Sequence, residues 1–355
     1  MPPELAVILV HYHTPQLAAE AVAALRADAA VQGIVAEWLL VDNGSDEAGK
    51  QALSALPVER VDPGRNLGFA GAVNLGVESS SAERLLIANP DVLVEPGCLG
   101  ALLAALESGF PIAGPRFFWD RTRRLLLPPA ERRTRRDEML AAVAARWPSW
   151  AGRARRRWRR HARRHWEAAE TLPSHDLSGG LLLFTRRAFH RIGRFDEGFE
   201  LYFEETDWLL RARRLGVGAA YVPAASAVHL YNQSAMREPR AAAWFETSAR
   251  RFRRRHYGEW FAGLLPRLAG QAHPAAAPPE APGSSLELSA FAGREPVWIE
   301  VSPHRLGFPA AAEHLPGSGR WTLPAELVGS PLFVTASDAA GRELGRWTLP
   351  GTGAA

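Results

Sequence analysis

The sequence has one cysteine and one lysine among its 355 residues, and each scarcity is informative. Cys98 has no second cysteine to pair with, which excludes an internal disulfide and favours a reducing compartment. A lone cysteine in an apolar stretch is more typical of packing than of a catalytic nucleophile. No run of about 18 or more apolar residues is present, so no transmembrane helix is predicted.

The N-terminus lacks the pattern of a secretory signal. Residues 5–10 are a strand-like apolar run with no basic region before it and no cleavage site after it. We therefore expect a cytoplasmic protein.

Lysine is almost entirely replaced by arginine, since Lys50 is the only lysine among 42 basic residues. A GC-rich genome is the plain explanation of that bias. The arginines are unevenly placed, however, because sixteen fall in residues 121–164 and five more in residues 250–255. The first cluster marks a basic insert, residues 121–170.

Short apolar runs alternate with segments of helical spacing through the first hundred residues and again after residue 180. This alternation predicts a doubly wound α/β fold with a mostly parallel sheet. In such sheets ligands bind at the carboxyl ends of the strands. The expected strands are residues 5–10, 37–41, 57–61, 84–88 and 181–184, and the expected helices are residues 17–25, 69–78, 99–106 and 205–215.

The C-terminal part of the chain has a different character. Residues 263–284 are rich in Ala and Pro and predict a linker. Residues 285–355 contain short alternating runs and predict a small β-sandwich-like, all-β module. The hexapeptide Gly-Arg-Trp-Thr-Leu-Pro occurs twice, at residues 319–324 and 345–350. Its tryptophans either pack in that module or face a ligand, and packing is the favoured interpretation.

Two aspartates stand where predicted strands end. Asp42 follows residues 37–41 and Asp91 follows residues 84–88, so both should face one crevice. Asp42 can accept hydrogen bonds from a ligand, or it can form only an Asx turn. Asp91 is a hard oxygen ligand suited to Mg²⁺ or Mn²⁺, and His229, which follows another apolar run, can complete such a site.

A later segment, residues 195–208, places six acids among aromatic residues. Desolvation disfavours the charged form of a carboxyl in such surroundings. The segment is therefore a candidate source of a general base or of metal ligands.

These motifs, in this order, resemble family 2 glycosyltransferases, and the match is closest to the rhamnosyltransferase-like branch. The resemblance covers roughly residues 5–260. The motifs are Val-Asp-Asn-Gly-Ser at 41–45, Asn-Leu-Gly-Phe-Ala-Gly-Ala-Val-Asn at 66–74, Asn-Pro-Asp at 89–91, Ser-Gly-Gly at 178–180, Phe-Asp-Glu at 195–197, Tyr-Phe-Glu-Glu-Thr-Asp at 202–207, and His229.

The resemblance implies a donor-binding half. Asp42 would hold the nucleobase, with Arg65 and Asn66 near it. Tyr12 would lie beside the donor, although its neighbours are histidines where the family often has Asn-Tyr-Asn.

The resemblance also implies a divalent metal, Mg²⁺ or Mn²⁺. Asn89 stands at the first position of the usual Asp-x-Asp motif. Asp91 would bind the metal that bridges the donor diphosphate, and His229 would assist it.

On the acceptor side, the resemblance implies that Gly179, Gly180 and Glu204 line the site. The family's general base is usually the Asp of a Glu-Asp pair. Here Glu205 falls at that position, one methylene longer, and Asp207 is a nearby substitute.

The implied fold is a GT-A-type nucleotide-diphospho-sugar transferase domain with a small C-terminal β module. The implied activity is metal-dependent, inverting transfer from a nucleotide sugar, with a deoxysugar such as dTDP-rhamnose a candidate, to a hydroxyl of a glycan or lipid-linked acceptor. The expected segments are a nucleotide-sugar-binding half at 1–120, the basic insert at 121–170, an acceptor-binding half at 171–262, the linker at 263–284 and the β module at 285–355.

Two other functions are compatible with the residues. A nucleotidyltransferase-like enzyme could use Asp42 and Asp91 on a similar sheet, although the acceptor-half motifs do not require it. A catalytically impaired glycan-binding protein would explain Glu205 at a position usually occupied by Asp.

The basic insert has its own pattern. On a helix, Trp150, Ala154, Trp158, His161 and His165 form one narrow stripe, with nearly all arginines of this segment elsewhere on the surface. A tryptophan face with cationic flanks suits an interfacial helix on an anionic membrane, at the inner face of the cell membrane. A solvated helix or loop is an equal alternative. Nucleic acid is not an expected partner, because an acidic cleft does not suit its backbone.

Overall fold

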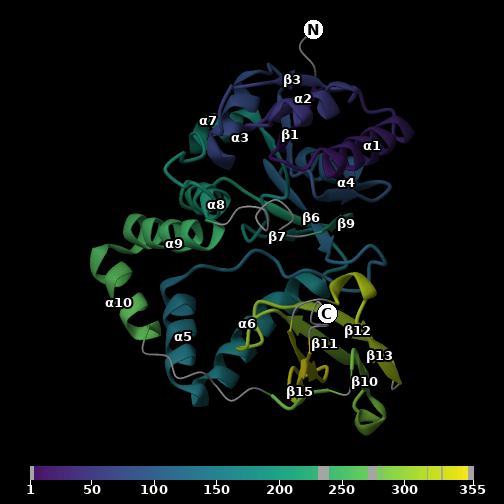
Figure 1. Cartoon of the computed structure of the whole chain (residues 1–355), viewed down its shortest axis with the longest axis vertical. Coiled ribbons are helices and arrows are strands. Elements are labelled where there is room, and N and C mark those ends of the chain that lie inside the picture. The colour runs from purple at the N-terminus through teal and green to yellow at the C-terminus, as the bar shows by residue number, and fades with distance from the viewer. Residues whose placement is uncertain are drawn as a thin grey trace. The chain divides into compact units, whose positions relative to one another are not determined.

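Figure 1 shows the computed structural model of the chain, which describes residues 4–230, 240–270, 278–281, 283–317, 319–328 and 331–350. The chain divides into two compact units. Unit 1 comprises Met1–Phe117 and Ala168–Gly258, and unit 2 comprises Phe118–Glu167 and Glu259–Ala355. The basic insert therefore belongs with the C-terminal module, which differs from the separate segment expected from composition.

Unit 1 is built on a mixed sheet with the strand order β3-β2-β1-β4-β8-β6-β9-β5, and β7 lies beside β9. The first four strands in that order are parallel, whereas β8 is antiparallel to β4 and β5 is antiparallel to β9. The strands are β1 (Leu5–His11), β2 (Ala36–Asp42), β3 (Glu59–Val61), β4 (Arg84–Ala88), β5 (Val92–Val94), β6 (Ile112–Phe118), β7 (Leu172–Pro173), β8 (Leu181–Thr185) and β9 (Ala220–His229).

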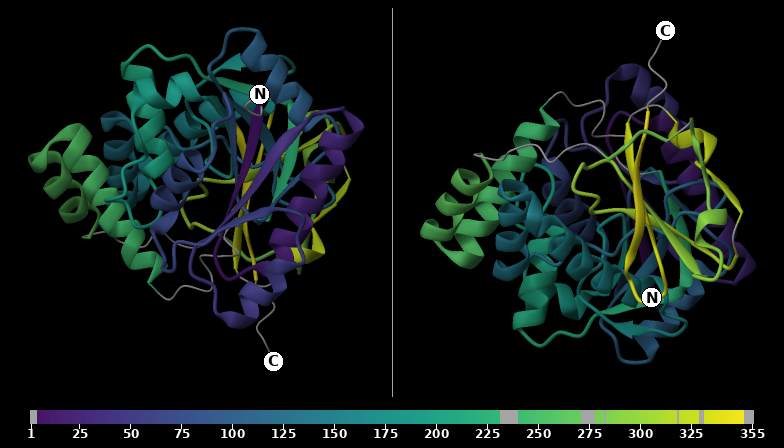
Figure 2. Two further views of the ribbon diagram at one scale, coloured as in Figure 1. Left: turned by 90° about the horizontal axis from the view of Figure 1, so that it is seen from above. Right: turned by 90° about the horizontal axis from the view of Figure 1, so that it is seen from below.

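Helices cover both faces of this sheet (Figures 1 and 2). On one face α1 contacts α4, and on the other α3 packs on β1 and β2. Gly76 of α3 is required by this packing, because a Cβ there would overlap Ile8. The helices of unit 1 are α1 (Pro15–Val31), α2 (Glu47–Ser54), α3 (Gly68–Glu78), α4 (Cys98–Glu107), α7 (Arg186–Ile192), α8 (Glu204–Arg214) and α9 (Ala241–Tyr257).

The predicted α/β order of unit 1 is confirmed. All seven residues of β1 are buried between β2 and β4, which is why the strand reads as a continuous apolar run. The third expected strand is shorter than predicted, and α1 is longer. Cys98 is buried as expected, and burial strongly raises the pKa of its thiol, so it is no nucleophile.

Unit 2 contains two small antiparallel sheets, β12-β11-β14-β15 and β10-β13. The predicted C-terminal β strands are therefore confirmed, and residues 289–291 between two of them form a 3₁₀ turn. The strands are β10 (Ser285–Glu287), β11 (Val297–Ser302), β12 (Ala311–Leu315), β13 (Arg320–Thr322), β14 (Leu332–Ser337) and β15 (Glu343–Leu349), and the helices are α5 (Arg135–Arg146), η1 (Pro148–Trp150), α6 (Ala151–Trp166), α10 (Glu259–Ala269), η3 (Ser289–Phe291) and η4 (Ala325–Leu327).

The repeated tryptophans pack in unit 2. Trp321 lies within the core of the unit, and Trp347 packs against that core. Trp321 also donates its indole N–H to Glu313 over 2.8 Å. The interpretation of the repeat as packing is confirmed. The predicted linker is wrong over its first residues, because α10 continues to Ala269, and residues 271–277 lie outside the described residues.

Helix α6 packs on the β strands of unit 2. The prediction that its tryptophan stripe faces a membrane is therefore wrong for most of the stripe. Trp158 lies edge-on to Trp166, with 5.7 Å between the ring centroids, and stacks on Phe308, with 6.3 Å between the ring centroids. His165 is buried. Most of the stripe is therefore an internal packing face, and only Trp150 at its start is exposed. No helix in the described part of the chain is long and apolar enough to cross a membrane.

Candidate active site

Asp91 and His229 come together where β4 ends and β9 ends. The antiparallel register pairs Val92 with His229, which places the preceding Asp91 beside the imidazole. The Nε2 atom of His229 lies 3.4 Å from Oδ1 of Asp91, and both residues are buried. The backbone N–H of Asn89 donates to the carbonyl of Gly180 over 2.8 Å, which joins this corner to the start of β8.

Two glycines of the Ser-Gly-Gly motif allow a close approach of side chains. A Cβ on Gly180 would lie 2.9 Å from Cε1 of His229, and a Cβ on Gly179 would lie 3.1 Å from Cβ of Glu205. A side chain at Gly180 would therefore displace the imidazole, and one at Gly179 would require Glu205 to shift by a few tenths of an ångström. The motif therefore links the Asp91–His229 pair to the first turn of α8.

The turn before α8 is strained. Tyr202 and Phe203 have φ values of 67° and 73°, a left-handed conformation that bulky residues rarely adopt. Each such residue costs about 1–3 kcal/mol and persists only when the surroundings enforce it. Here the strain places Glu204 and Glu205 at the N-terminus of α8, where the helix dipole favours negative charge.

The two glutamates differ in environment. Glu204 is only 4% exposed, and its Oε2 atom has no hydrogen-bond partner. Burial, and then the charge of Glu205, raise the pKa of Glu204 well above its ordinary value. This shift favours the neutral form of Glu204. Glu205 is half-buried, and its side chain lies against Gly179.

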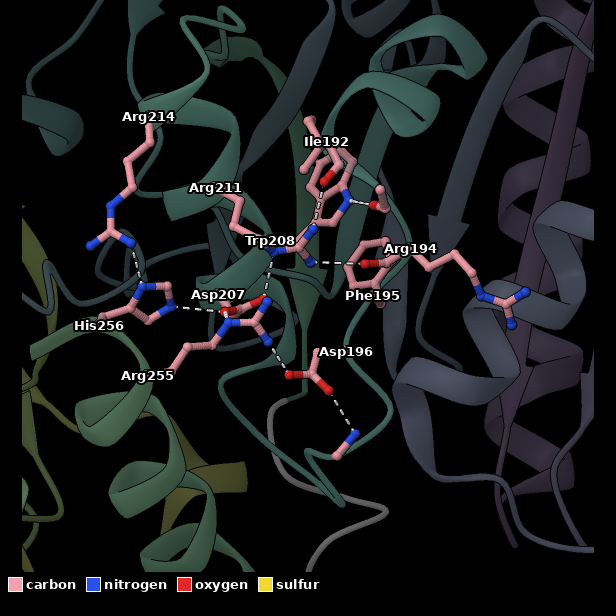
Figure 3. A network of polar contacts seen from close by, with 12 residues as sticks. Ile192, Arg194, Phe195, Asp196, Asp207, Trp208, Arg211, Arg214, Arg255 and His256 are labelled. Carbon is pink, nitrogen blue, oxygen red and sulfur yellow. Dashed lines mark hydrogen bonds and ion pairs between the residues drawn. The ribbon is translucent and has the colours of Figure 1, made fainter. Parts of the chain in front are cut away.

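Asp207, the expected substitute base, is held by α8 and α9 (Figure 3). Arg211 lies 2.8 Å from its Oδ2 atom, while His256 and Arg255 lie 2.8 Å and 3.2 Å from Oδ1. Burial alone would raise the pKa of Asp207, but the hydrogen bond from His256 and the arginine charges outweigh it and lower that pKa. A fully buried, ionised and paired carboxylate is suited to holding helices together and poorly suited to accepting a proton.

Asp42 lies at the end of β2, next to the end of β1. His11 is its partner in the strand register, and the imidazole Nδ1 lies 3.6 Å from Oδ1 of Asp42. Nε2 of His11 accepts a hydrogen bond from the backbone N–H of Thr14 over 2.9 Å. The neutral imidazole therefore carries its proton on the other nitrogen, Nδ1. Burial lowers the pKa of His11 more than Asp42 raises it.

The second oxygen of Asp42 has no partner. Its Oδ2 atom is buried without a hydrogen bond in the described structure, whereas Oδ1 accepts from the backbone N–H of Ser45 over 3.2 Å. An unsatisfied buried acceptor is costly and rare in a folded protein. This atom therefore marks a position where a ligand can donate a hydrogen bond.

The glycine-rich turn beside Asp42 is tied to β2 by Asn43. Its side chain accepts from the backbone N–H of Leu67 over 2.7 Å and donates to the side chain of Asn66 over 3.0 Å. The side chain of Asn66 thus accepts a hydrogen bond within the turn, although the residue is exposed. Arg65 is exposed, and Tyr12 is half-buried with its ring centroid 4.4 Å from that of His13.

The predicted metal ligands, Asp91 and His229, lie close enough together to bind one cation. Asp91 and His229 offer one oxygen and one nitrogen within contact distance of each other. Among the described residues no group of three or more His, Cys, Asp or Glu side chains is placed to hold a metal. Two protein ligands fit Mg²⁺ or Mn²⁺ at a phosphate-binding site, because these ions commonly take their other ligands from water and from substrate phosphates.

Sequence reasoning missed the two residues that position Asp42 and its turn, His11 and Asn43. His11 was noted only as a departure from a motif, although its place at the end of β1 beside the end of β2 was a usable signal. The partners of Asp207 on α9 gave no signal, because His256 lies 49 residues from it in the chain and Arg255 is the residue before His256.

The chain belongs to glycosyl transferase family 2, whose sequence model matches residues 6–193. The predicted family and its GT-A-type α/β domain are thereby confirmed.

Two named relatives are similar in sequence. The N-acetylglucosaminyl-diphospho-decaprenol L-rhamnosyltransferase of Mycobacterium tuberculosis is 33% identical over 250 residues, which are 65% of this chain and 79% of that protein. The low-salt glycan biosynthesis hexosyltransferase Agl10 of Haloferax volcanii is 24% identical over 200 residues, 55% of this chain and 59% of that protein. A solved mannosyltransferase of Pyrobaculum calidifontis, in complex with GDP-Man and Mn²⁺, matches 76% of this chain and 70% of its own at 16% identity and a TM-score of 0.46.

Proposed function

We propose that this glycosyltransferase moves a deoxysugar, with rhamnose the first candidate, from a nucleotide-diphosphate donor to a hydroxyl of a lipid-linked glycan. The observation that carries the proposal is the convergence of Glu205 with the Asp91–His229 pair across the two glycines of one motif. The name of the mycobacterial relative, which specifies a rhamnosyl group and a diphospho-decaprenol acceptor, supports this choice of donor and acceptor.

In the proposed reaction Glu205 accepts the proton of the acceptor hydroxyl as that oxygen attacks the anomeric carbon. Attack from the face opposite the nucleotide inverts the anomeric configuration in one displacement. One carboxylate base is enough for this chemistry, because a single displacement requires only the acceptor hydroxyl to lose a proton. The raised pKa of Glu204 favours its neutral form, which leaves Glu205 as the base of the pair. Asp207 is assigned a positioning role at the start of α8.

On the donor side, Asp42 would accept a hydrogen bond from the nucleobase through Oδ2, while His11 and Ser45 hold the carboxylate in place. Asp91 and His229 would hold a divalent cation. When bound, such a cation supplies positive charge that stabilises the leaving diphosphate.

Incubation with nucleotide sugars, Mn²⁺ and a lipid-linked acceptor tests the proposal and separates it from the two alternatives. Sugar transfer with an inverted anomeric centre supports it. Transfer of a nucleotide group would identify a nucleotidyltransferase, and donor or glycan binding without any turnover would identify a binding protein.

The metal assignment predicts that Asp91→Asn requires more Mn²⁺. Outer partners of metal ligands typically change metal affinity by about ten- to a hundred-fold, and a direct ligand should matter at least as much. The half-saturating Mn²⁺ concentration should therefore rise by more than about tenfold. Initial rates and donor binding measured across a Mn²⁺ titration provide the check.

The matched control is Asp62→Asn, which removes the same charge from an exposed carboxylate and should leave the titration unchanged. Full turnover by the Asp91 variant in the presence of a chelator would refute the metal assignment.

The donor assignment predicts that Asp42→Ala raises the donor KM by about ten- to a hundred-fold, the usual effect of losing a hydrogen bond to a charged group. The maximal rate should change much less, because a nucleobase contact is equally present in ground and transition states. Steady-state kinetics with varied donor measure both. An unchanged donor KM, in a variant whose thermal unfolding midpoint is near that of the wild type, would show that Asp42 is only a turn residue.

A further inference from the structure

A groove of about 820 Å³ lies within unit 2 and is lined by residues of α5, η1 and α6 and of the turn between the helices. Its apolar lining comes from Met139, Leu140 and Val143, which share one face of α5, and from Trp147 and Trp150 at the turn between the helices. The two tryptophans are 44% and 41% exposed. Large aromatic side chains are rarely left this exposed beside an apolar groove without a partner.

Four arginines line the same groove. Arg157 forms an ion pair with Asp137, and the guanidinium of Arg153 lies 4.9 Å from the ring centroid of Trp150. Arg136 and Arg160 are exposed and have no carboxylate within ion-pair distance in the described part of the chain. The groove therefore carries net positive charge above an apolar lining.

The buried arginines of α6 face away from this groove. On the opposite face of α6, Arg155 and Arg159 are buried and bind Glu343 and Glu300 of the β strands. The sheet-facing arginines are thus neutralised within the unit, whereas Arg136, Arg153 and Arg160 of the groove have no acid partner among the described residues. Helix α6 itself contains no acidic residue.

We propose that this groove docks unit 2 on an anionic lipid bilayer. The tryptophans would enter the interfacial region, and Arg136, Arg153 and Arg160 would pair with lipid phosphates. A bilayer surface supplies both an apolar layer and a layer of negative charge, which are the two properties that the groove complements. Single-stranded nucleic acid fits less well, because bases stack on aromatic rings and not on Met, Leu and Val side chains.

The docking surface is thus a different one from the stripe that the sequence suggested, although it lies on the same helix. Docking needs neither donor nor metal. Its test is therefore independent of the proposed sugar transfer, and either proposal can fail alone.

The test is co-sedimentation of the full chain with phosphatidylcholine vesicles that contain about one-third phosphatidylglycerol, at low salt, compared with pure phosphatidylcholine. The wild type should sediment with the anionic vesicles and should be released progressively as salt rises. Arg136→Gln/Arg153→Gln/Arg160→Gln should partition about 100-fold more weakly, since each arginine near such a surface contributes roughly five-fold.

The control is a triple variant with the same loss of charge outside the groove, Arg187→Gln/Arg213→Gln/Arg250→Gln, at exposed arginines of unit 1. It should bind anionic vesicles nearly as well as the wild type. An equal loss of vesicle binding in the two triple variants would show a general effect of net charge and would overturn the proposal. Failure of the wild type to bind either kind of vesicle would also overturn it.

Two further experiments identify what the groove binds. Trp147→Ser/Trp150→Ser should abolish the binding that survives moderate salt, while leaving the thermal unfolding midpoint within a few degrees because both side chains are exposed. Pyrophosphate or a single-stranded oligonucleotide, added at constant ionic strength, should not displace the protein from the vesicles. Displacement by either would assign the groove to a soluble phosphate or to nucleic acid and would end the membrane proposal.

Discussion

Replacing Glu205 by Gln should lower the rate of sugar transfer by about 10²–10⁴-fold, the usual contribution of a positioned general base. The amide keeps the shape of the side chain beside Gly179 but cannot accept the proton of the acceptor hydroxyl. Donor binding should be nearly unchanged, because Glu205 acts on the acceptor. Single-turnover transfer and donor titrations measure the two effects separately.

The structure offers a matched control at the adjacent position. Glu204→Gln makes the same chemical change, but at a carboxyl whose pKa is raised by burial, which favours the neutral form. This variant should therefore keep its rate within a few-fold. Glu205→Asp, which restores the residue usual at this position of the family, should stay active. If Glu204→Gln is crippled while Glu205→Gln is not, the base has been assigned to the wrong carboxyl.

The architecture of unit 1 could be predicted because its strands are buried on both faces. Residues of β1 and β4 have no polar alternation, and each run ends at turn residues, so both the length and the ends of the strands are visible in the sequence. The rule that ligands bind at the carboxyl ends of such strands then placed Asp42 and Asp91 on one edge of the sheet.

The role of the insert could not be predicted from its sequence. Helical periodicity shows which residues share one face of a helix, but it does not show which part of the protein packs against that face. The stripe that includes Trp158 was correctly recognised as one face of a helix. Its partner, however, is a β sheet whose strands begin more than a hundred residues later. The sequence also gave no reason to bury Arg159, since its acid partner Glu300 lies 141 residues away.

Asp207 illustrates the same limit within the site. Its position two residues after Glu205 made it a nearby substitute for the base on sequence alone. Its engagement by α9 depends on Arg255 and His256, which the fold brings back to α8 (Figure 3). Only the tertiary structure distinguishes a carboxylate that is available from one that is occupied.

The buried ion pair of unit 2 leads to the largest expected effect on stability. The Arg159 guanidinium is 1% exposed and is bound by both oxygens of Glu300, by Oε1 of Glu343 at 3.4 Å and by the carbonyl of Gly341 at 2.9 Å. Burial alone would lower the pKa of Arg159, but Glu300 outweighs it and raises that pKa, so the pair is ionised. Arg159→Met would leave Glu300 buried without its main cation, at a cost of about 3–5 kcal/mol.

Urea unfolding followed by tryptophan fluorescence measures this cost, because nine of the twelve tryptophans lie in unit 2. Arg159→Met/Glu300→Leu should recover most of the loss, since replacing both charges with apolar groups is often neutral. Arg156→Met, at an exposed arginine of the same helix, should change stability by about 0.5 kcal/mol or less. Donor binding by unit 1 should persist in all three variants. A loss in Arg159→Met no larger than in Arg156→Met would show that the network does not hold α6 to the β strands.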